Sequence, residues 1–248
     1  MSVQSLVSAV LCAALGSALG STAWAGVTVT TGGGYVPIVE KLVAHCEKTT
    51  GVKVEKSFGG NIGQMLAQIA SGSGVNVVIT DRTTLQNLKT PVRFSTVQKL
   101  GNSPLVLVWG KKTKMDSPDD LATDAVSRIA QPDPKAAVYG RAGSEWVGNQ
   151  PEAFRNAVAP KVLTVAGVPQ VMSYVLQGEV DAGFVNAQAA KKNRDKLGGL
   201  TAIAEGFTPI EMVAAVVEGH ENDADVKKFL ESLATPEGKK VLSAAGVE

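Results

Sequence analysis

Cysteine and histidine are scarce in this chain, which has two of each among 248 residues. Cys12 lies in an apolar N-terminal stretch that we expect to be removed, so Cys46 would remain alone and could form no internal disulfide. His45 precedes Cys46 on an expected helix, where adjacent side chains do not face each other, and this disfavours a thiol–imidazole pair. Nor does the sequence contain a G-x-S-x-G elbow, a P-loop or a paired-cysteine site. We therefore expect a protein that is not an enzyme and carries no cofactor.

A strong charge of either sign is also absent. The 24 basic and 23 acidic residues give a formal net charge of +1, and no basic run stands out beyond "WGKKTK", which we interpret as a solvated loop. A nucleic-acid-binding surface would need more positive charge in one place. The polar run His220 to Asp223 could hold a metal, but such runs are usually solvated turns, so we expect no metal site.

The N-terminus looks like a secretory signal peptide. Residues 1–25 contain an apolar stretch too short to span a bilayer comfortably, then small residues ending in Ala23-Trp24-Ala25, an A-x-A cleavage pattern. No Lys or Arg precedes the apolar stretch, which is unusual for such a leader. No later segment is apolar enough to cross a membrane. We expect cleavage before Gly26 and a soluble, monomeric protein in the periplasm.

Strands and helices alternate through the first part of the chain. Val27 to Thr31 reads as a buried strand, Gly32 to Gly34 permit a tight turn, and Pro37 suits the first turn of a helix. A half-buried strand from Val52 to Phe58, the turn "GGNIG" and a second helix follow. Val77 to Thr80 then predicts a third strand, with Thr83 as the cap of a short helix.

A second set of such units follows from Leu105. We expect a strand ending at Val138 with a glycine turn at Gly140, a helix opened by Pro169, and strands at Asp181 to Val185 and Met212 to Val217. Alternation of this kind predicts α/β lobes with mostly parallel sheets flanked by helices. Because no flexible linker separates the two sets, we expect a two-lobed architecture with a ligand cleft between the lobes. Lobe 1 comprises residues 26–103 and 208–248, and lobe 2 residues 104–207.

Glycine or proline turns open helices at several strand ends, in "TGGGYVP", "FGGNIG", "VYGRAGS" and "AGVPQ". Helix N-termini that converge on one place offer backbone amides to a small anion without needing a lysine. The polar side chains that these turns would present are Tyr35, Asn61, Tyr139, Arg141, Ser144 and Asn186.

With these turns, the sequence resembles the periplasmic molybdate/tungstate-binding proteins of ABC importers. The segment from "VTVTTGGGYVPIVEKL" to "GQMLAQIASG" is similar to that family's opening, "LGNSPLVLVWGK" to its crossing segment, and "QPDPKAAVYGRAGSEWV" to its D-P turn and following helix. The resemblance implies a periplasmic-binding-protein fold, a small oxyanion ligand and an inner-membrane permease as partner.

The resemblance also implies a set of ligand-binding positions. Tyr35 stands where the family has a serine, and Asn186 where it has a tyrosine, so we expect both to face the ligand. Arg141 is a cation beside a site that usually has none. The full expected set is Gly34, Tyr35, Gly60, Asn61, Ile62, Tyr139, Gly140, Arg141, Val168 and Asn186.

Two alternatives remain open at this point. The same fold could bind another small anion or an organic acid through Arg141. An exported ligand sensor or enzyme could also be built on this scaffold.

Overall fold

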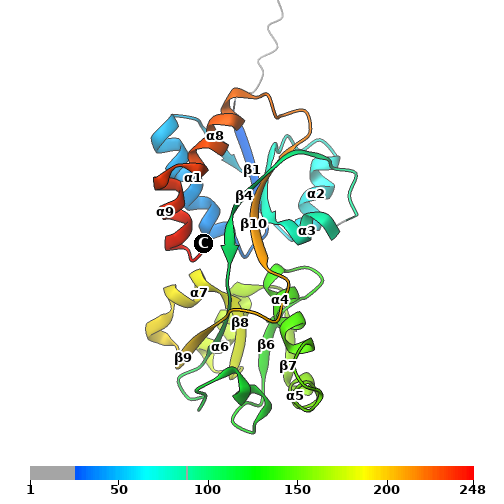
Figure 1. Cartoon of the computed structure of the whole chain (residues 1–248), viewed down its shortest axis with the longest axis vertical. Helices are drawn as coiled ribbons and strands as arrows, with labels where there is room; N and C mark the ends of the chain where they lie inside the picture. Colours follow the sequence, from blue (N-terminus) through cyan, green and yellow to red (C-terminus); the bar gives the residue numbers. More distant parts are fainter. Residues whose placement is uncertain (1–25, 88) are drawn as a thin grey trace, which may run out of the picture.

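The structure is a computed structural model that describes residues 26–87 and 89–248. The expected signal peptide, residues 1–25, lies outside the described residues. Within them, no helix is long and apolar enough to cross a membrane. The chain forms two α/β lobes stacked along the long axis of the molecule, each built on a five-stranded sheet (Figure 1).

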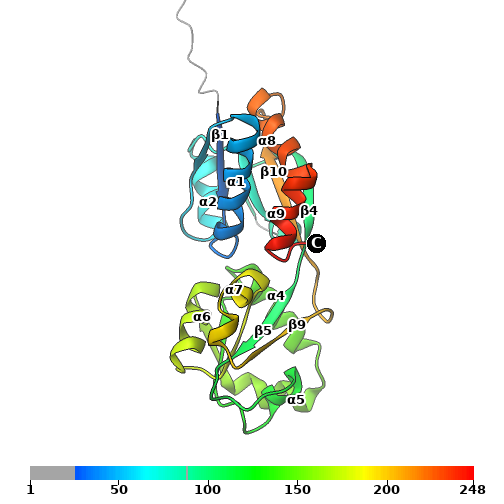
Figure 2. The ribbon, with the colours of Figure 1, turned by 90° about the vertical axis from the view of Figure 1, so that its left-hand side faces the viewer.

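The sheet of the first lobe has the strand order β2-β1-β3-β10-β4. Its strands are β1 (Val27–Thr31), β2 (Val54–Lys56), β3 (Val77–Asp81), β4 (Phe94–Ser103) and β10 (Ile210–Val217). Its helices are α1 (Val36–Thr50), α2 (Ile62–Ala70), α3 (Arg82–Asn87), α8 (Ala224–Ala234) and α9 (Pro236–Ala244). Helices α1, α8 and α9 pack together on one side of the sheet, and α2 and α3 lie on the other (Figures 1 and 2).

The sheet of the second lobe has the strand order β7-β6-β8-β5-β9. Its strands are β5 (Leu105–Trp109), β6 (Ile129–Pro132), β7 (Val162–Val165), β8 (Ala182–Asn186) and β9 (Gly199–Ile203). Its α-helices are α4 (Val138–Gly148), α5 (Glu152–Val158), α6 (Val168–Gln177) and α7 (Ala187–Lys192), and short 3₁₀ helices are η1 (Pro118–Ala122), η2 (Ala159–Lys161) and η3 (Arg194–Lys196).

Both sheets are mostly parallel, as the alternation of strands and helices predicts. Strands β2, β1 and β3 are parallel, while β10 is antiparallel to both β3 and β4, so four strands run one way and β10 runs against them. In the second sheet β5 is the strand that opposes β7, β6, β8 and β9. The carboxyl ends of parallel strands lie at the same end of the sheet, where α/β proteins bind ligands.

The two lobes are joined by two crossing segments. The chain leaves the first sheet at Ser103 and enters the second at Leu105, then leaves the second at Ile203 and returns at Ile210. Residues of both lobes share one large apolar core cluster. The lobes therefore pack against each other beside the two short crossing segments.

Helices cover both faces of the second sheet. Adjacent residues of β8 point to opposite faces, so their side chains show which helix lies on each face. A side chain at Gly183 would meet Val171 of α6, whereas the neighbouring Phe184 lies against Gly143 of α4. The strand is therefore buried on both faces, which explains why "AGFV", before the polar Asn186, is apolar or small without alternation.

Three local expectations are wrong. The strand expected to end at Val138 ends at Pro132, and Val138 starts α4, because the D-P turn separates strand from helix earlier than the β-prone "AAVY" suggests. Strand β2 is shorter than residues 52–58. The short helix α3 is capped by Asp81 rather than Thr83, since the Thr84 amide donates to Asp81 Oδ1 at 3.1 Å.

Candidate functional site

A cavity of about 740 Å³ lies between the lobes, where the loops after the parallel strands meet. The first lobe contributes residues 32–35, residues 60–64, Thr80, Thr84 and Asn87. The second lobe contributes residues 133–139, Arg141 and residues 166–169. Each of the four turns identified from the sequence therefore reaches this cavity.

Helices α1, α4 and α6 begin at the cavity without a side-chain cap. Among the described residues, the amides of Gly34, Val138 and Val168 donate to no acceptor. The Val138 and Val168 amides are the first of their helices and carry the positive end of the helix dipole, while Gly34 lies just before the N-cap residue of α1. Free donors from both lobes thus line one cavity, an arrangement suited to an anion.

Helix α2 is different because its own side chains satisfy two of the amides at its start, those of Asn61 and Gln64. Asn61 Oδ1 accepts from the Gln64 amide at 3.1 Å, and Gln64 Oε1 accepts from the Asn61 amide at 3.0 Å, which is a capping box. Gly60 needs its glycine, since its φ is +77° and a side chain would meet Gln64. Gly32, Gly33 and Gly34 have no positive φ, so the expected need for special glycine geometry applies to Gly60 and not to them.

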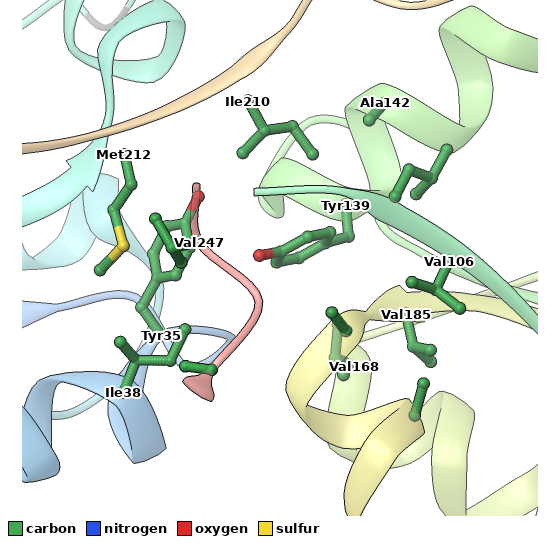
Figure 3. Close-up of a cluster of buried hydrophobic side chains, with 14 of the residues drawn as sticks. Tyr35, Ile38, Val106, Tyr139, Ala142, Val168, Val185, Ile210, Met212 and Val247 are labelled. Carbon is green, nitrogen blue, oxygen red and sulfur yellow. The ribbon is translucent and has the colours of Figure 1, made fainter. Parts of the chain in front are cut away.

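Two buried tyrosines, one from each lobe, form part of the cavity wall. Tyr35 and Tyr139 are each 2% exposed, and their rings meet edge to face (Figure 3). The Tyr139 hydroxyl is 2.7 Å from Ser103 Oγ, whereas the Tyr35 hydroxyl has no partner among the described residues. Burial, with smaller contributions from Tyr139 and the charge of Asp81, raises the pKa of Tyr35 well above its usual range. Tyr35 is therefore a protonated, unused donor.

Arg141 lines the cavity, but carboxylates hold its guanidinium. Nη2 lies 3.3 Å from Asp81 Oδ1 in the other lobe, and Nη1 lies 3.0 Å from Glu145 Oε1 one turn along α4. Glu145 also accepts from the Thr208 amide at 2.7 Å. Partial burial raises the pKa of Glu145, but the Thr208 amide and Arg141 outweigh it, so this pKa lies below its ordinary value. The network links both lobes to the second crossing segment.

Asn186 does not line the cavity. Its Nδ2 donates to the Gly34 carbonyl at 2.8 Å across the lobes, and its Oδ1 accepts from the Ala189 amide to cap α7. Both ends of the side chain are used, and the residue is 4% exposed. The expectation that its side chain faces a ligand is wrong for this structure, because the residue caps a helix directly after a buried strand.

Two further expected positions lie elsewhere. Gly140 is buried and permits close packing, since a side chain there would collide with the Pro132 carbonyl. Ser144 is exposed on α4 and is not part of the cavity wall. The remaining expected positions, Gly34, Tyr35, Gly60, Asn61, Ile62, Tyr139, Arg141 and Val168, all line the cavity.

The other candidate clusters give no site in the described part of the chain. His45 Nε2 lies near Thr235 Oγ1 and Cys46 Sγ near Thr50 Oγ1, so the histidine and the thiol face different neighbours. His220 pairs with Asp223 in an exposed turn. Across residues 26–87 and 89–248, no group of three or more His, Cys, Asp or Glu side chains could hold a metal.

Sequence reasoning missed several wall residues. Thr80 and Thr84 flank Asp81 at the end of β3, and Asp133 to Lys135 form the turn before α4. A polar "TDRTT" directly after a buried apolar strand was the available signal, because carboxyl ends of parallel strands meet at a ligand site.

Two α/β lobes joined by two crossing segments, with a cavity between them, define the periplasmic-binding-protein fold. The model of the bacterial extracellular solute-binding protein family matches residues 27–248, and the chain belongs to this family. The resemblance inferred from the sequence is thereby confirmed at the level of the family.

Known relatives agree with this assignment. The molybdate-binding protein ModA of Azotobacter vinelandii is 26% identical over 234 residues, covering 90% of this chain and 89% of ModA. The solved structure of the periplasmic molybdate-binding protein of Azotobacter vinelandii has a TM-score of 0.73 at 23% identity, covering 90% of this chain and 98% of that one. PEB3, known from Campylobacter jejuni, was solved with bound L-phospholactate. That structure has a TM-score of 0.73 at 19% identity, and the match covers 89% of this chain and 98% of PEB3. The structural likenesses show the shared fold.

Proposed function

We propose that this chain is the solute-binding component of an ABC importer, exported to the periplasm, and that it binds a small oxyanion such as molybdate or tungstate. It would deliver this ion to a permease in the inner membrane. The family assignment supports solute binding, and the molybdate-binding relatives support the ligand class. The A-x-A leader supports export.

The observation that carries the proposal is the convergence of unused donors from both lobes. The amides of Gly34, Val138 and Val168, and the hydroxyl of Tyr35, have no acceptor among the described residues and belong to one cavity wall. A buried anion must have its acceptors satisfied, and preorganised amides at helix N-termini do this without a net cation. Binding across the lobes would hold them together.

The remaining expected positions would shape this site rather than donate to the ligand. Gly60, Asn61 and Ile62 form the wall at the start of α2, where the capping box already engages the Asn61 and Gln64 amides. Tyr139 packs against Tyr35 and is fixed by Ser103. Specificity would then come from cavity size and from the fixed directions of few donors.

The proposed activity is binding and not turnover. Asp81 and Glu145 are both engaged by Arg141, and both tyrosines are protonated. Asp133, which lines the cavity, accepts from the Lys135 amide at 2.9 Å. None of these groups is placed as a general base beside a nucleophile, which acyl or phosphoryl transfer would need.

The test is calorimetric titration of the exported protein with molybdate, tungstate, sulfate and phosphate. We expect saturable 1:1 binding of molybdate or tungstate, accompanied by a rise in Tm that grows with ligand concentration. Absence of both effects with every ion would refute the oxyanion assignment.

A second ligand class is favoured by one observation. The cavity, about 740 Å³, is larger than a single tetrahedral ion needs, and exposed Lys135 lies on its wall. The neighbour PEB3 was solved with L-phospholactate, an organic anion. Including L-phospholactate in the titration panel decides between inorganic oxyanions and organic anions, since only the ligand that fits should saturate the protein at low concentration.

A further inference from the structure

The charge of Arg141 is shared between two carboxylates that approach different edges of the guanidinium. Glu145, about one-third exposed, takes Nη1, and it belongs to the same helix. Asp81, with a side chain that is 0% exposed, takes Nη2 from across the lobes. Because Nη2 and Nε form one of the edges that grip carboxylates and phosphates, Asp81 occupies an edge that a ligand would otherwise use.

Asp81 is the one partner of the Nη2–Nε edge of Arg141 among the described residues. Arg141 Nε and Asp81 Oδ2 are both buried, and neither makes a hydrogen bond to any described residue. Each belongs to a group whose neighbouring atom is in the 3.3 Å contact. Nothing else in the described chain therefore competes for this side of Arg141.

Asp81 is also well placed to act on a ligand without touching it. Thr80 before it and Thr84 after it both line the cavity, whereas Asp81 lies buried behind the wall. Its Oδ1 caps the start of α3 by accepting from the Thr84 amide. A buried carboxylate at this position repels an anion in the cavity and also binds the cation that would attract it.

We propose that Asp81 is a specificity-determining residue, which keeps Arg141 from serving as an anion ligand and so leaves recognition to the uncharged donors. This inference rests on the proposed oxyanion-binding function. Without Asp81, Arg141 would offer its Nη2–Nε edge to the ligand. Ions with more concentrated charge, such as phosphate, would gain most, because charge-assisted hydrogen bonds strengthen with the charge on each oxygen.

The experiment compares Asp81→Asn with the unaltered exported protein by calorimetric titration with molybdate and with inorganic phosphate. Asparagine can also cap a helix, so α3 should keep its start, and a thermal melt checks this. We expect phosphate affinity to rise by about tenfold or more and the preference for molybdate over phosphate to shrink. Unchanged phosphate affinity in a folded Asp81→Asn protein would overturn the proposal.

The double variant Asp81→Asn with Arg141→Gln is the matched control, because it removes both charges together. Its phosphate affinity should return to the parent level, and its molybdate affinity should stay within about threefold of the parent. A loss of molybdate affinity of about 100-fold would show that Arg141 binds the ligand directly. This variant keeps the proposal testable even if Asp81→Asn alone does not fold.

The parent titration separates this inference from the proposed function. If the parent binds no oxyanion but Asp81→Asn binds phosphate, the proposed function fails and the role of Asp81 stands. If the parent binds molybdate but Asp81→Asn gains no phosphate affinity, the role of Asp81 fails alone. If neither protein binds any ion, both fail.

Discussion

Tyr35 and Tyr139 meet across the two lobes with ring centroids 5.9 Å apart and ring planes inclined by 63°. The Tyr139 hydroxyl is bonded to Ser103, and the Tyr35 hydroxyl is not bonded to any described residue. Burial raises the pKa of both rings above the usual range, so both stay protonated at neutral pH. The pair is therefore asymmetric, because one hydroxyl is bonded to the fold and the other is buried without a partner among the described residues.

Replacing Tyr35 with Phe tests that asymmetry. We expect anion binding to weaken by about 1–3 kcal/mol, because a bound acceptor would lose its donor. The free energy of unfolding should stay the same or rise, because phenylalanine buries no unpartnered hydroxyl. Calorimetric titration and urea unfolding measure the two effects.

Tyr139→Phe is the matched control. It removes the bond to Ser103, so the free energy of unfolding should fall by about 0.5–1.5 kcal/mol. If Tyr35→Phe binds the anion as tightly as the parent, Tyr35 does not contact the ligand.

Asn186→Asp tests the contact between the lobes. Aspartate can still accept from the Ala189 amide, but its carboxylate cannot donate to the Gly34 carbonyl. We expect the ligand-free lobes to separate more, which small-angle X-ray scattering would detect as a larger radius of gyration. Asn186→Ala also removes the cap of α7 and should cost about 1 kcal/mol of stability in addition. A scattering curve identical to that of the parent would mean that this bond does not restrain the lobes.

Two glycine substitutions separate backbone strain from ligand access. Gly60→Ala requires a φ near +77° and places a methyl group against Gln64 Oε1, so it should lower the free energy of unfolding by about 1 kcal/mol or more. Gly33→Ala meets nothing within 4 Å and should change stability by less than about 0.5 kcal/mol. Chemical unfolding decides this, and equal losses from both would contradict the assigned geometry.

Glu145 should make stability depend on acid. Its pKa in the folded protein lies below the ordinary value of 4.5, so its contribution is fully present above pH 4.5 and is lost as the pH falls through the folded pKa. Glu145→Gln should therefore be less stable than the parent at pH 6, and the difference should shrink below pH 4.5. Urea unfolding at a series of pH values measures it, and a difference that does not vary with pH would exclude this role.

Much of the architecture could be predicted from the sequence, because periodicity and turn residues are local signals. Thr235 caps α9 through the Gly238 amide, and Asn61 caps α2, each where a polar residue precedes an apolar periodic run. The sequence around Val138 favours a strand, because a β-branched residue beside an aromatic one is typical of strands and the run is too short to show a helical period. Residues 133–137 form the turn that separates β6 from α4, so Val138 begins the helix.

The site could be predicted only in part, because its key pairs are formed between residues far apart in the chain. The turns that line the cavity were recognisable, but the partner of Arg141 is Asp81, 60 residues away. Asn186 likewise binds Gly34, 152 residues away. Family resemblance located Asn186 at a ligand position, while its actual contacts depend on how the lobes meet.

The most direct test of the proposed site is a crystal structure of the exported protein grown with tungstate, because tungsten scatters X-rays anomalously. We expect one strong anomalous peak between the lobes, with oxygens within hydrogen-bond distance of the Gly34, Val138 and Val168 amides and the Tyr35 hydroxyl. A peak elsewhere, or no peak in crystals grown at saturating tungstate, would contradict it.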